Sequence, residues 1–359
     1  MIVKLGSLIS EYSVRNKADE DIPVYSVTNE QGFCTGYFSK EVASQDRTTY
    51  KIVPRGCFAY NPSRINVGSV DVQECEDRVI VSPLYVVFSV DEKLNRRYLL
   101  HYLKSDITLT YIKAYASGSV RDNLKFSILK DFPINLPSAE EQGQIVATLD
   151  GIEHLIALRK EEIASLDELV KSRFIELFGD PVYNTKKLPT KRLAELGSLD
   201  RGRSQHRPRN APELLGGPYP LIQTGEVANA GLYITGYSNT YSELGLKQSK
   251  MWKAGTLCIT IAANIAQTSI LTFDACFPDS VVGFIPGDSI SAIYMHYWFG
   301  FFQKILEEQA PQVAQKNINL KILSDLSVVV PNQEQQKDFI AFVEQTDKSK
   351  LCGEMEVAA

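Results

Sequence analysis

The sequence predicts an α+β fold: two similar mixed α/β domains separated by a long antiparallel coiled-coil helix pair, with pseudo-two-fold symmetry. Three observations predict it. A block at 122–142 returns at 316–336, so that Pro137 reappears as Pro331. An apolar seam with a spacing of about 3.5 residues runs from 145 to 177. In each half, strand-like runs come before a late helical run. Solenoid repeats are only about 20–50 residues long, so this much longer offset indicates a duplicated domain.

Four segments follow from this pattern. We expect a first domain at 1–137, a central helix at 138–180, a second domain at 181–331 and a C-terminal helix at 332–359. Helical runs are expected at about 94–115 and 290–309. The expected strands are Ile22–Val27, Cys57–Tyr60, Arg78–Val81, Tyr85–Val90, Pro220–Gln223, Thr256–Ile261 and Val281–Ile285.

The central helix has clear start and stop signals. Ser138 followed by Glu141 is typical of a capping box, and Gly179-Asp180-Pro181 is typical of a helix end. Arg159 and Arg173 occupy the two slots that interrupt the apolar series. The seam residues expected to pack against a partner helix are Ile145, Leu149, Ile152, Ile156, Ile163, Leu166, Val170 and Leu177.

The C-terminal helix begins in the same way, because Phe339 and Val343 take the places of Ile145 and Leu149. The pattern then fades, with Lys350 where Ile156 stands and with Cys352-Gly353 following. We therefore expect a shorter second helix with frayed last residues.

Composition narrows the protein class. The net charge of −5 is concentrated in 140–178, which holds nine acidic and four basic residues, so the flanking domains are neutral. A hydrophobic content of 44% and a charged content of 23% are typical of a globular protein. No apolar run reaches the roughly 18–20 residues of a membrane span, and no signal-peptide pattern opens the chain. The six cysteines form no C-x-x-C pair, which favours reduced thiols and a cytoplasmic location.

Catalytic motifs are missing from the sequence. There is no glycine-rich phosphate loop. Asn61-Pro62-Ser63-Arg64 lacks the second proline and the aromatic residue of the amino-methyltransferase motif, and Asp91-Glu92-Lys93 lacks a preceding Pro-Asp. The histidines never stand at zinc-ligand spacing, and we interpret His101 and His296 as packing residues. We therefore expect neither catalysis nor a bound cofactor in this chain.

Polar loops at corresponding places in the two halves are the candidate binding features. The strongest is 201–210, where four arginines accompany amides, and its weaker counterpart is 15–17. Arginine pairs with guanine or phosphate, and amides match adenine. A second pair is 60–66 with 261–267, and a third is 118–121 with 312–316. A solvated loop is the alternative for the first pair, and a turn at the start of a helix for the third. The candidate contacts are Arg15, Asn16, Lys17, Tyr60, Asn61, Arg64, Asn66, Arg121, Arg201, Arg203, Gln205, Arg207, Arg209, Asn264 and Gln267.

These motifs resemble the specificity (S) subunit of type I restriction-modification systems. The resemblance rests on Leu136-Pro137-Ser138-Ala139-Glu140-Glu141-Gln142, on Phe178-Gly179-Asp180 at the helix end, and on Pro331-Asn332-Gln333-Glu334-Gln335-Gln336. The segment from Tyr60 to Gly68 is also similar to a common target-recognition segment. The resemblance covers essentially the whole chain.

The resemblance implies two target-recognition domains that each read one half of a bipartite site in double-stranded DNA. The helices would set the gap between the half-sites and dock two methyltransferase subunits. Those subunits would bring S-adenosylmethionine, and the restriction/translocase subunits that join them would use ATP and Mg. No catalysis would reside in this chain. The alternative is a helical scaffold that binds proteins and not DNA. A self-sufficient restriction enzyme is opposed by the missing motifs.

One departure from the family pattern concerns the second helix. The family usually has two helices of comparable length, and the second helix here is shorter. We therefore expect the distal seam of the first helix, Ile163, Leu166, Val170 and Leu177, to lack a partner. A truncated allele, or another polypeptide that supplies the missing helix, would explain the difference.

Overall fold

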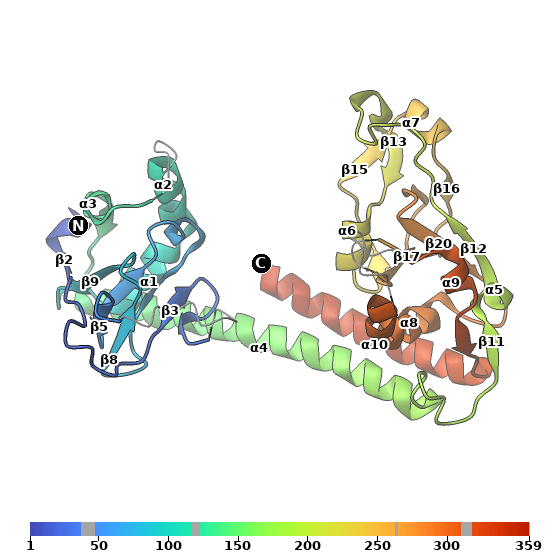
Figure 1. Ribbon diagram of the computed structural model, residues 1–359, viewed down its shortest axis with the longest axis horizontal. Coiled ribbons are helices and arrows are strands. Elements are labelled where there is room, and N and C mark those ends of the chain that lie inside the picture. The colour runs from blue at the N-terminus through green and yellow to red at the C-terminus, as the bar shows by residue number, and fades with distance from the viewer. Residues whose placement is uncertain (37–46, 117–122, 263–264, 310–317, 359) are drawn as a thin grey trace. The chain divides into compact units, whose positions relative to one another are not determined.

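The computed structural model describes residues 1–36, 47–116, 123–262, 265–309 and 318–358. The chain forms two compact units, Met1–Ala157 and Leu158–Ala359, and the division between them falls inside one long helix, α4. Each unit mixes helices and strands, as the predicted α+β class requires (Figure 1). None of the described helices is long and apolar enough to span a membrane.

The first unit is built on an antiparallel sheet with the strand order β2-β9-β6-β7. Helix α1 lies against β7, and apolar residues of both form one core with Leu5 and Phe58. Three further antiparallel pairs, the hairpin β3-β4 and the pairs β5-β8 and β1-β10, complete the unit. The elements are β1 Ile2–Lys4, β2 Ile9–Glu11, β3 Ser26–Thr28, β4 Gly32–Cys34, β5 Lys51–Pro54, β6 Phe58–Tyr60, β7 Val70–Val72, β8 Arg78–Val81, β9 Val86–Val90, α1 Arg96–Lys104, α2 Asp106–Ala116, α3 Phe126–Leu129, β10 Pro133–Asn135 and the start of α4, Ala139–Phe178.

The second unit has a five-stranded sheet in the order β12-β20-β17-β18-β14 and a four-stranded sheet in the order β15-β13-β19-β16. The pair β11-β21 corresponds to β1-β10 of the first unit. The elements are β11 Thr190–Arg192, α5 Leu193–Leu196, β12 Gly197–Arg201, β13 Leu215–Leu221, α6 Thr224–Asn229, β14 Tyr233–Ile234, β15 Asn239–Tyr241, α7 Glu243–Lys247, β16 Met251–Trp252, β17 Leu257–Thr260, β18 Thr268–Leu271, β19 Ala275–Cys276, β20 Val281–Pro286, α8 Ala292–Gln309, α9 Leu320–Ser324, β21 Ser327–Val329 and α10 Gln333–Ala358.

Most expected elements are confirmed, and three are wrong in extent. The run Pro220–Gln223 contributes only its first two residues to β13, which begins at Leu215. The run Ile22–Val27 contributes only its last two residues to β3, because Ile22 and Val24 pack in a small separate cluster. The helical run at 94–115 divides at Ser105. The Ser105 hydroxyl donates to the Tyr102 carbonyl at 2.8 Å and accepts from the Thr108 amide at 3.3 Å. One serine therefore ends α1 and caps α2.

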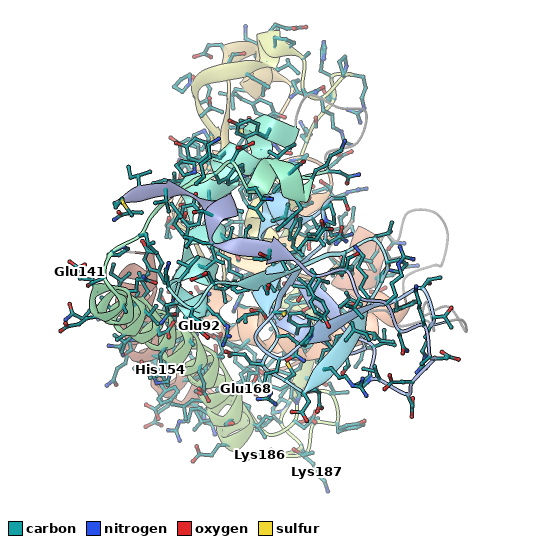
Figure 2. All side chains as sticks on the ribbon, turned by 90° about the vertical axis from the view of Figure 1, so that its left-hand side faces the viewer. Glu92, Glu141, His154, Glu168, Lys186 and Lys187 are labelled. Carbon is teal, nitrogen blue, oxygen red and sulfur yellow. The ribbon has the colours of Figure 1, made fainter. Side chains whose placement is uncertain are left out.

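Helix α4 confirms the predicted central helix, with 40 residues from Ala139 to Phe178. The Glu141 carboxylate accepts from the Ser138 amide at 2.9 Å, and the Glu141 amide donates to the Ser138 hydroxyl at 3.2 Å, which is the expected capping box. Gly179 ends the helix with a φ of 75°. Polar side chains such as Glu141, His154 and Glu168 project from α4 (Figure 2).

A buried glutamine side chain in the first turn of each long helix bonds the backbone of its own unit, and we call this contact the glutamine clamp. In the first unit, Gln142 is 1% exposed, and its Oε1 accepts from the Asn95 amide at 2.7 Å. Its Nε2 donates to the carbonyls of Lys93, at 3.0 Å, and Pro137, at 3.1 Å. One amide side chain thus satisfies three backbone groups and ties α4 to the start of α1.

In the second unit, Gln336 occupies the corresponding place and is 4% exposed. Its Oε1 accepts from the Ser291 amide at 3.1 Å, and its Nε2 donates to the Ser289 and Pro331 carbonyls, each at 3.0 Å. The duplicated sequence block therefore folds into a duplicated contact. A second pair of bonds repeats as well, because the Tyr98 hydroxyl donates to Asn135 and the Tyr294 hydroxyl donates to Val329.

Within the second unit, α4 and α10 run side by side in opposite directions (Figure 1). The Phe174 and Phe339 rings are 5.4 Å apart, whereas Asp167, earlier in α4, forms an ion pair with Lys350, later in α10. Helix α10 continues through Gly353 to Ala358, close to the expected range of 332–359. A glycine inside a helix costs only about 1 kcal/mol, which the packing of the helix outweighs.

The expected unpartnered seam is also wrong in its location. Val170 is fully buried against Phe339 and Val343, and Leu177 packs against the same core. In an antiparallel pair the end of α4 faces the beginning of α10, and Val170 and Leu177 lie in that part of α4. In the first unit, Ile145 and Ile152 at the beginning of α4 are 37% and 49% exposed. Leu149, Ile156, Ile163 and Leu166 are half-buried.

Candidate nucleic-acid interface

The arginine-rich loop at 201–210 is held in place by Asp279. The Arg201 guanidinium donates to the Asp279 carbonyl from Nε at 3.0 Å and from Nη2 at 2.7 Å. Arg209 forms an ion pair with the Asp279 carboxylate at 2.7 Å. Arg207 donates to the carbonyls of Ser204, at 2.6 Å, and His206, at 2.8 Å. These three arginines therefore shape the loop, and their hydrogen-bonding groups are partly used.

Arg203 and Gln205 are exposed, and their side chains form no hydrogen bond or ion pair among the described residues. Their backbone is fixed, because Gln248 Oε1 accepts from the amides of Gln205, at 2.7 Å, and His206, at 3.0 Å. The Ser249 hydroxyl donates to the Arg203 carbonyl at 3.0 Å. A preorganised loop thus presents one guanidinium and one amide to solvent.

The first-unit counterpart at 15–17 has one buried residue and two exposed ones. Asn16 is 1% exposed, and its side chain bonds the Glu20 carbonyl at 2.9 Å and the Glu20 amide at 3.0 Å. The expectation that Asn16 contacts a ligand is therefore wrong, because the amide is consumed in building the turn. Arg15 and Lys17 are exposed and border a cavity of about 500 Å³ with Arg78.

The turn at 60–69 places its candidate residues in different environments. Tyr60 is 0% exposed and its hydroxyl donates to the Leu124 carbonyl at 3.2 Å, so the prediction of a surface contact is wrong for Tyr60. Asn61 Oδ1 accepts from the Ser63 amide at 3.1 Å and the Ser63 hydroxyl at 2.9 Å, which shapes the turn. Asn66 is half-buried, and Arg64 is exposed.

A small cavity of about 250 Å³ lies between this turn and the turn that joins β3 to β4. Asn29, Glu30 and Gln31 line it from one side, and Asn61 and Arg64 line it from the other. We name this cavity the β3–β4 notch. Asn29 and Gln31 were not among the residues predicted from the sequence. Their signal was weak: two polar residues before Gly32, between strands of only three residues each.

Gln267, in the second unit, lies on the wall of a cavity of about 810 Å³ with His296, Tyr297 and Lys350. His296 Nδ1 lies 3.0 Å from the Thr268 hydroxyl, and burial lowers the pKa of His296 to about 4. The imidazole is therefore neutral at pH 7, in agreement with its interpretation as a packing residue. Two candidates, Arg121 and Asn264, and the pair of segments 118–121 and 312–316 lie outside the described residues.

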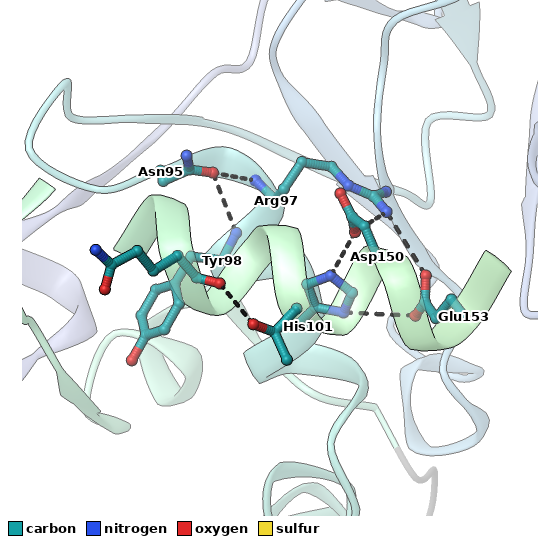
Figure 3. A network of polar contacts seen from close by, with 8 residues as sticks. Asn95, Arg97, Tyr98, His101, Asp150 and Glu153 are labelled. Atoms are coloured by element: carbon teal, nitrogen blue, oxygen red, sulfur yellow. Dashed lines mark hydrogen bonds and ion pairs between the residues drawn. The ribbon is translucent and has the colours of Figure 1, made fainter. Parts of the chain in front are cut away.

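His101 belongs to a network of ions that joins α1 to α4 (Figure 3). Its Nε2 lies 2.7 Å from Asp150 Oδ1, and its Nδ1 lies 3.4 Å from Glu153 Oε1. Arg97 Nη2 also lies 2.7 Å from Asp150 Oδ1 and 3.6 Å from Glu153 Oε2. The interpretation of His101 as a packing residue is therefore wrong. The hydrogen bond from Arg97 lowers the pKa of Asp150.

Three residues of this network, His101, Asp150 and Glu153, each offer an atom of a kind that binds metal ions, and these atoms lie close together. The Arg97 guanidinium already occupies the Asp150 oxygen that faces His101. A cation at that point would be repelled by the arginine, so the residues present do not fit a metal. The network instead provides a polar tether between the first domain and α4.

Comparison with known proteins assigns the family. The family model described as "Type I restriction modification DNA specificity domain" matches residues 6–168 and again residues 186–352. The two matches cover most of the chain and repeat in tandem. The chain belongs to this family.

Individual specificity subunits agree with the family match. The chain is 29% identical over 171 residues to the type I restriction enzyme MjaIX specificity subunit of Methanocaldococcus jannaschii, which covers 43% of this chain and 38% of that relative. The chain therefore spans well under two thirds of the length of this relative.

Solved structures share the fold. A chain from a structure described as the basis of complex assembly and conformational transition of the type I R-M system is 18% identical, with a TM-score of 0.60, over 100% of this chain and 93% of that one. A type I restriction-modification S subunit from M. genitalium is 14% identical, with a TM-score of 0.55, over 100% and 92%. At these identities the likeness concerns the specificity-subunit fold alone.

Proposed function

We propose that this chain is the DNA-recognition subunit of a type I restriction-modification complex, in which each α/β domain reads one half of a bipartite site. The observation that carries the proposal is the repeated glutamine clamp. Gln142 and Gln336 fix each domain to the first turn of its own long helix through the same three backbone groups. Two recognition domains that are attached in the same way to a helical spacer are suited to a DNA site made of two separate half-sites.

The helix pair is proposed as the spacer that sets the gap between the half-sites, with the two domains related by a pseudo-two-fold axis. A helix of 40 residues is about 60 Å long at 1.5 Å per residue. The ion network and the aromatic packing anchor opposite ends of α4 to different domains. A rigid helix anchored at both ends converts its length into a fixed separation.

The exposed apolar face at the beginning of α4 is proposed as the docking surface for methyltransferase subunits. Ile145, Ile152 and Leu155 are 37%, 49% and 62% exposed. Charged residues surround them, and this arrangement is typical of helices that pair with a partner helix. The methyltransferase subunits would supply S-adenosylmethionine, and restriction subunits bound through them would supply ATP-driven translocation. This chain would supply sequence recognition and no catalysis.

Charge supports the need for these partners. The two domains together are neutral, so they have little non-specific attraction for phosphates. Arg203 and Gln205 on one domain and Arg64 on the other offer base-reading groups without a broad basic patch. The family membership favours DNA recognition over the alternative of a helical scaffold that binds proteins alone.

An insertion in α4 tests the proposal. Seven residues added between Ala157 and Leu158 lengthen the helix by about 10 Å, or about 3 base pairs. The complex with its methyltransferase subunits is expected to recognise the same two half-sites with a longer gap, read by mapping methylated adenines. The control is the same insertion beside Gly236, where an added Cβ meets no atom within 4 Å. An unchanged gap in the lengthened helix would contradict the spacer role.

A further inference from the structure

The β3–β4 notch is formed by two turns that are each rigidly held. On the hairpin side, Asp71 Oδ2 accepts from the Phe33 amide at 2.9 Å, and the Thr28 hydroxyl accepts from the Gln31 amide at 3.0 Å. A Cβ at Gly32 would lie 1.9 Å from the same Asp71 oxygen, so the hairpin sits directly on β7. The side chains at 29–31 are therefore presented from a fixed backbone.

The opposite turn is anchored in the core of the first unit. Ile65 is fully buried, and Asn61 bonds the Ser63 amide and hydroxyl. Gly68 has a φ of +88°, and a Cβ there would lie 2.4 Å from Asn29 Oδ1. The two turns therefore touch at Gly68 and Asn29, and the notch between them has a defined shape.

Within the described residues, three polar side chains on the rim have no protein partner. Asn29, Gln31 and Arg64 are exposed, and in the described part of the chain none of their side chains forms a hydrogen bond or an ion pair. Preorganised but unsatisfied donors and acceptors beside a cavity are suited to a polar ligand. The matching rim of the second domain includes residues that lie outside the described part of the chain.

The mixed charge of the rim fits a base edge better than a phosphate group. The rim carries one guanidinium, that of Arg64, one carboxylate, that of Glu30, and several neutral amides. A phosphate site would gather positive charge, because phosphate contacts are dominated by lysine and arginine. A carboxylate disfavours a phosphate and tolerates a base edge, where it can accept from cytosine N4.

We propose that the β3–β4 notch is the base-reading site of the first domain, in which Arg64 pairs with a guanine and the amides of Asn29 and Gln31 pair with an adjacent adenine. The proposal rests on the function proposed above and names the specificity-determining residues of one half-site. Arginine matches guanine O6 and N7, and an amide matches adenine N6 and N7. Two of these three residues come from the hairpin, which sequence motifs did not identify.

The test uses the complex of this chain with its methyltransferase subunits. Adenine methylation by the wild-type complex first defines the bipartite site. Duplexes carrying that site, and duplexes with each base pair replaced in turn, are then used in binding competition with Arg64→Ala and Gln31→Ala. The matched control is Arg55→Ala, an exposed arginine of the same unit that does not line the notch.

Arg64→Ala is expected to weaken binding to the correct site by about tenfold to a hundredfold, the usual value of a bidentate base contact. Discrimination is expected to be lost at one position of one half-site, with the other half-site and the salt dependence unchanged. Gln31→Ala is expected to relax a neighbouring position of the same half-site.

Three results would overturn the proposal: uniform weakening on all duplexes with a shallower salt dependence, which marks a phosphate contact; no change; or a change in both half-sites. Failure of the proposed function looks different, because the wild-type complex would then methylate no bipartite site at all.

Discussion

The two ends of α4 are attached to their domains by opposite kinds of chemistry. In the first unit, α4 meets α1 through Arg97, His101, Asp150 and Glu153. In the second unit, the end of α4 is buried in an aromatic cluster, where Phe174 stacks on Tyr294 at 5.2 Å. The end of α4 has no glutamine clamp, because Gln142 holds the beginning of α4 and Gln336 holds the beginning of α10. The difference teaches that one long helix can be fixed to one domain by polar groups and to the other by apolar packing.

The largest expected effect of this difference concerns Phe174. Phe174→Ala removes a fully buried ring that contacts Tyr294, Phe339 and Phe178, and burial losses of this kind cost about 3–5 kcal/mol. Ile152→Ala, the matched change on the exposed part of the same helix, is expected to cost less than about 1 kcal/mol. Chemical denaturation measures both. Equal losses would contradict the asymmetry.

The next effect is a pH dependence located in the second unit. Burial lowers the pKa of His296 to about 4, whereas an unfolded histidine titrates near about 6.5. As the pH falls from about 6.5 to 4, the unfolded chain binds a proton that the folded chain does not bind, and stability decreases by up to about 3 kcal/mol. His296→Gln is expected to flatten this dependence in unfolding experiments at several pH values. An unchanged profile would show that His296 is not the titrating group.

The glutamine clamps should respond equally, because they make the same bonds. Gln142→Ala and Gln336→Ala each leave buried backbone groups without a partner, which costs about 1–3 kcal/mol. Hydrogen exchange at the first turns of α4 and α10 is expected to accelerate to a similar degree in the two variants. A strong effect at one clamp alone would show that the surrounding chemistry, and not the clamp, holds that domain.

The smallest effect concerns the ion network. The hydrogen bond from Arg97 lowers the pKa of Asp150, so its stabilisation is present above the pKa of an unfolded aspartate and is lost as the pH falls through the folded value. The carboxylate is partly exposed, and solvent screening keeps the effect small. Asp150→Asn is expected to remove this acid-dependent loosening of α1 from α4, followed by NMR titration. Glu162→Gln, which alters an ion pair elsewhere on α4, is the control.

Prediction from the sequence succeeded where the signal was local. Ser138, Glu141 and Gly179 mark the ends of α4 through bonds to residues only a few positions away. The duplicated block likewise contains both clamp glutamines, Gln142 and Gln336, but the repeat does not show which bonds they make. The predicted helix boundaries were wrong where one residue ends one helix and caps the next, as Ser105 does between α1 and α2.

Prediction failed where distant segments meet. The heptad pattern assigned the slot at Arg173 to the seam, but the buried residue is its neighbour Phe174, because α8 and α10 both face that side of α4. Arg201 and Arg209 of the 201–210 loop bond Asp279, although it is 70 or more residues away in the chain. Tyr60 and Asn16 were assigned to a surface that their own bonds exclude.

The sequence by itself determined that the chain is a tandem duplication with a long capped helix between its halves, since repeats, caps and periodicity are written in neighbouring residues. Only the tertiary structure decided which face of α4 is buried, which arginines remain available, and that Asn29 and Gln31 meet Arg64 across one notch. The physical reason is that burial and hydrogen-bond satisfaction depend on which segments come together, and a polar residue alone does not reveal its partner.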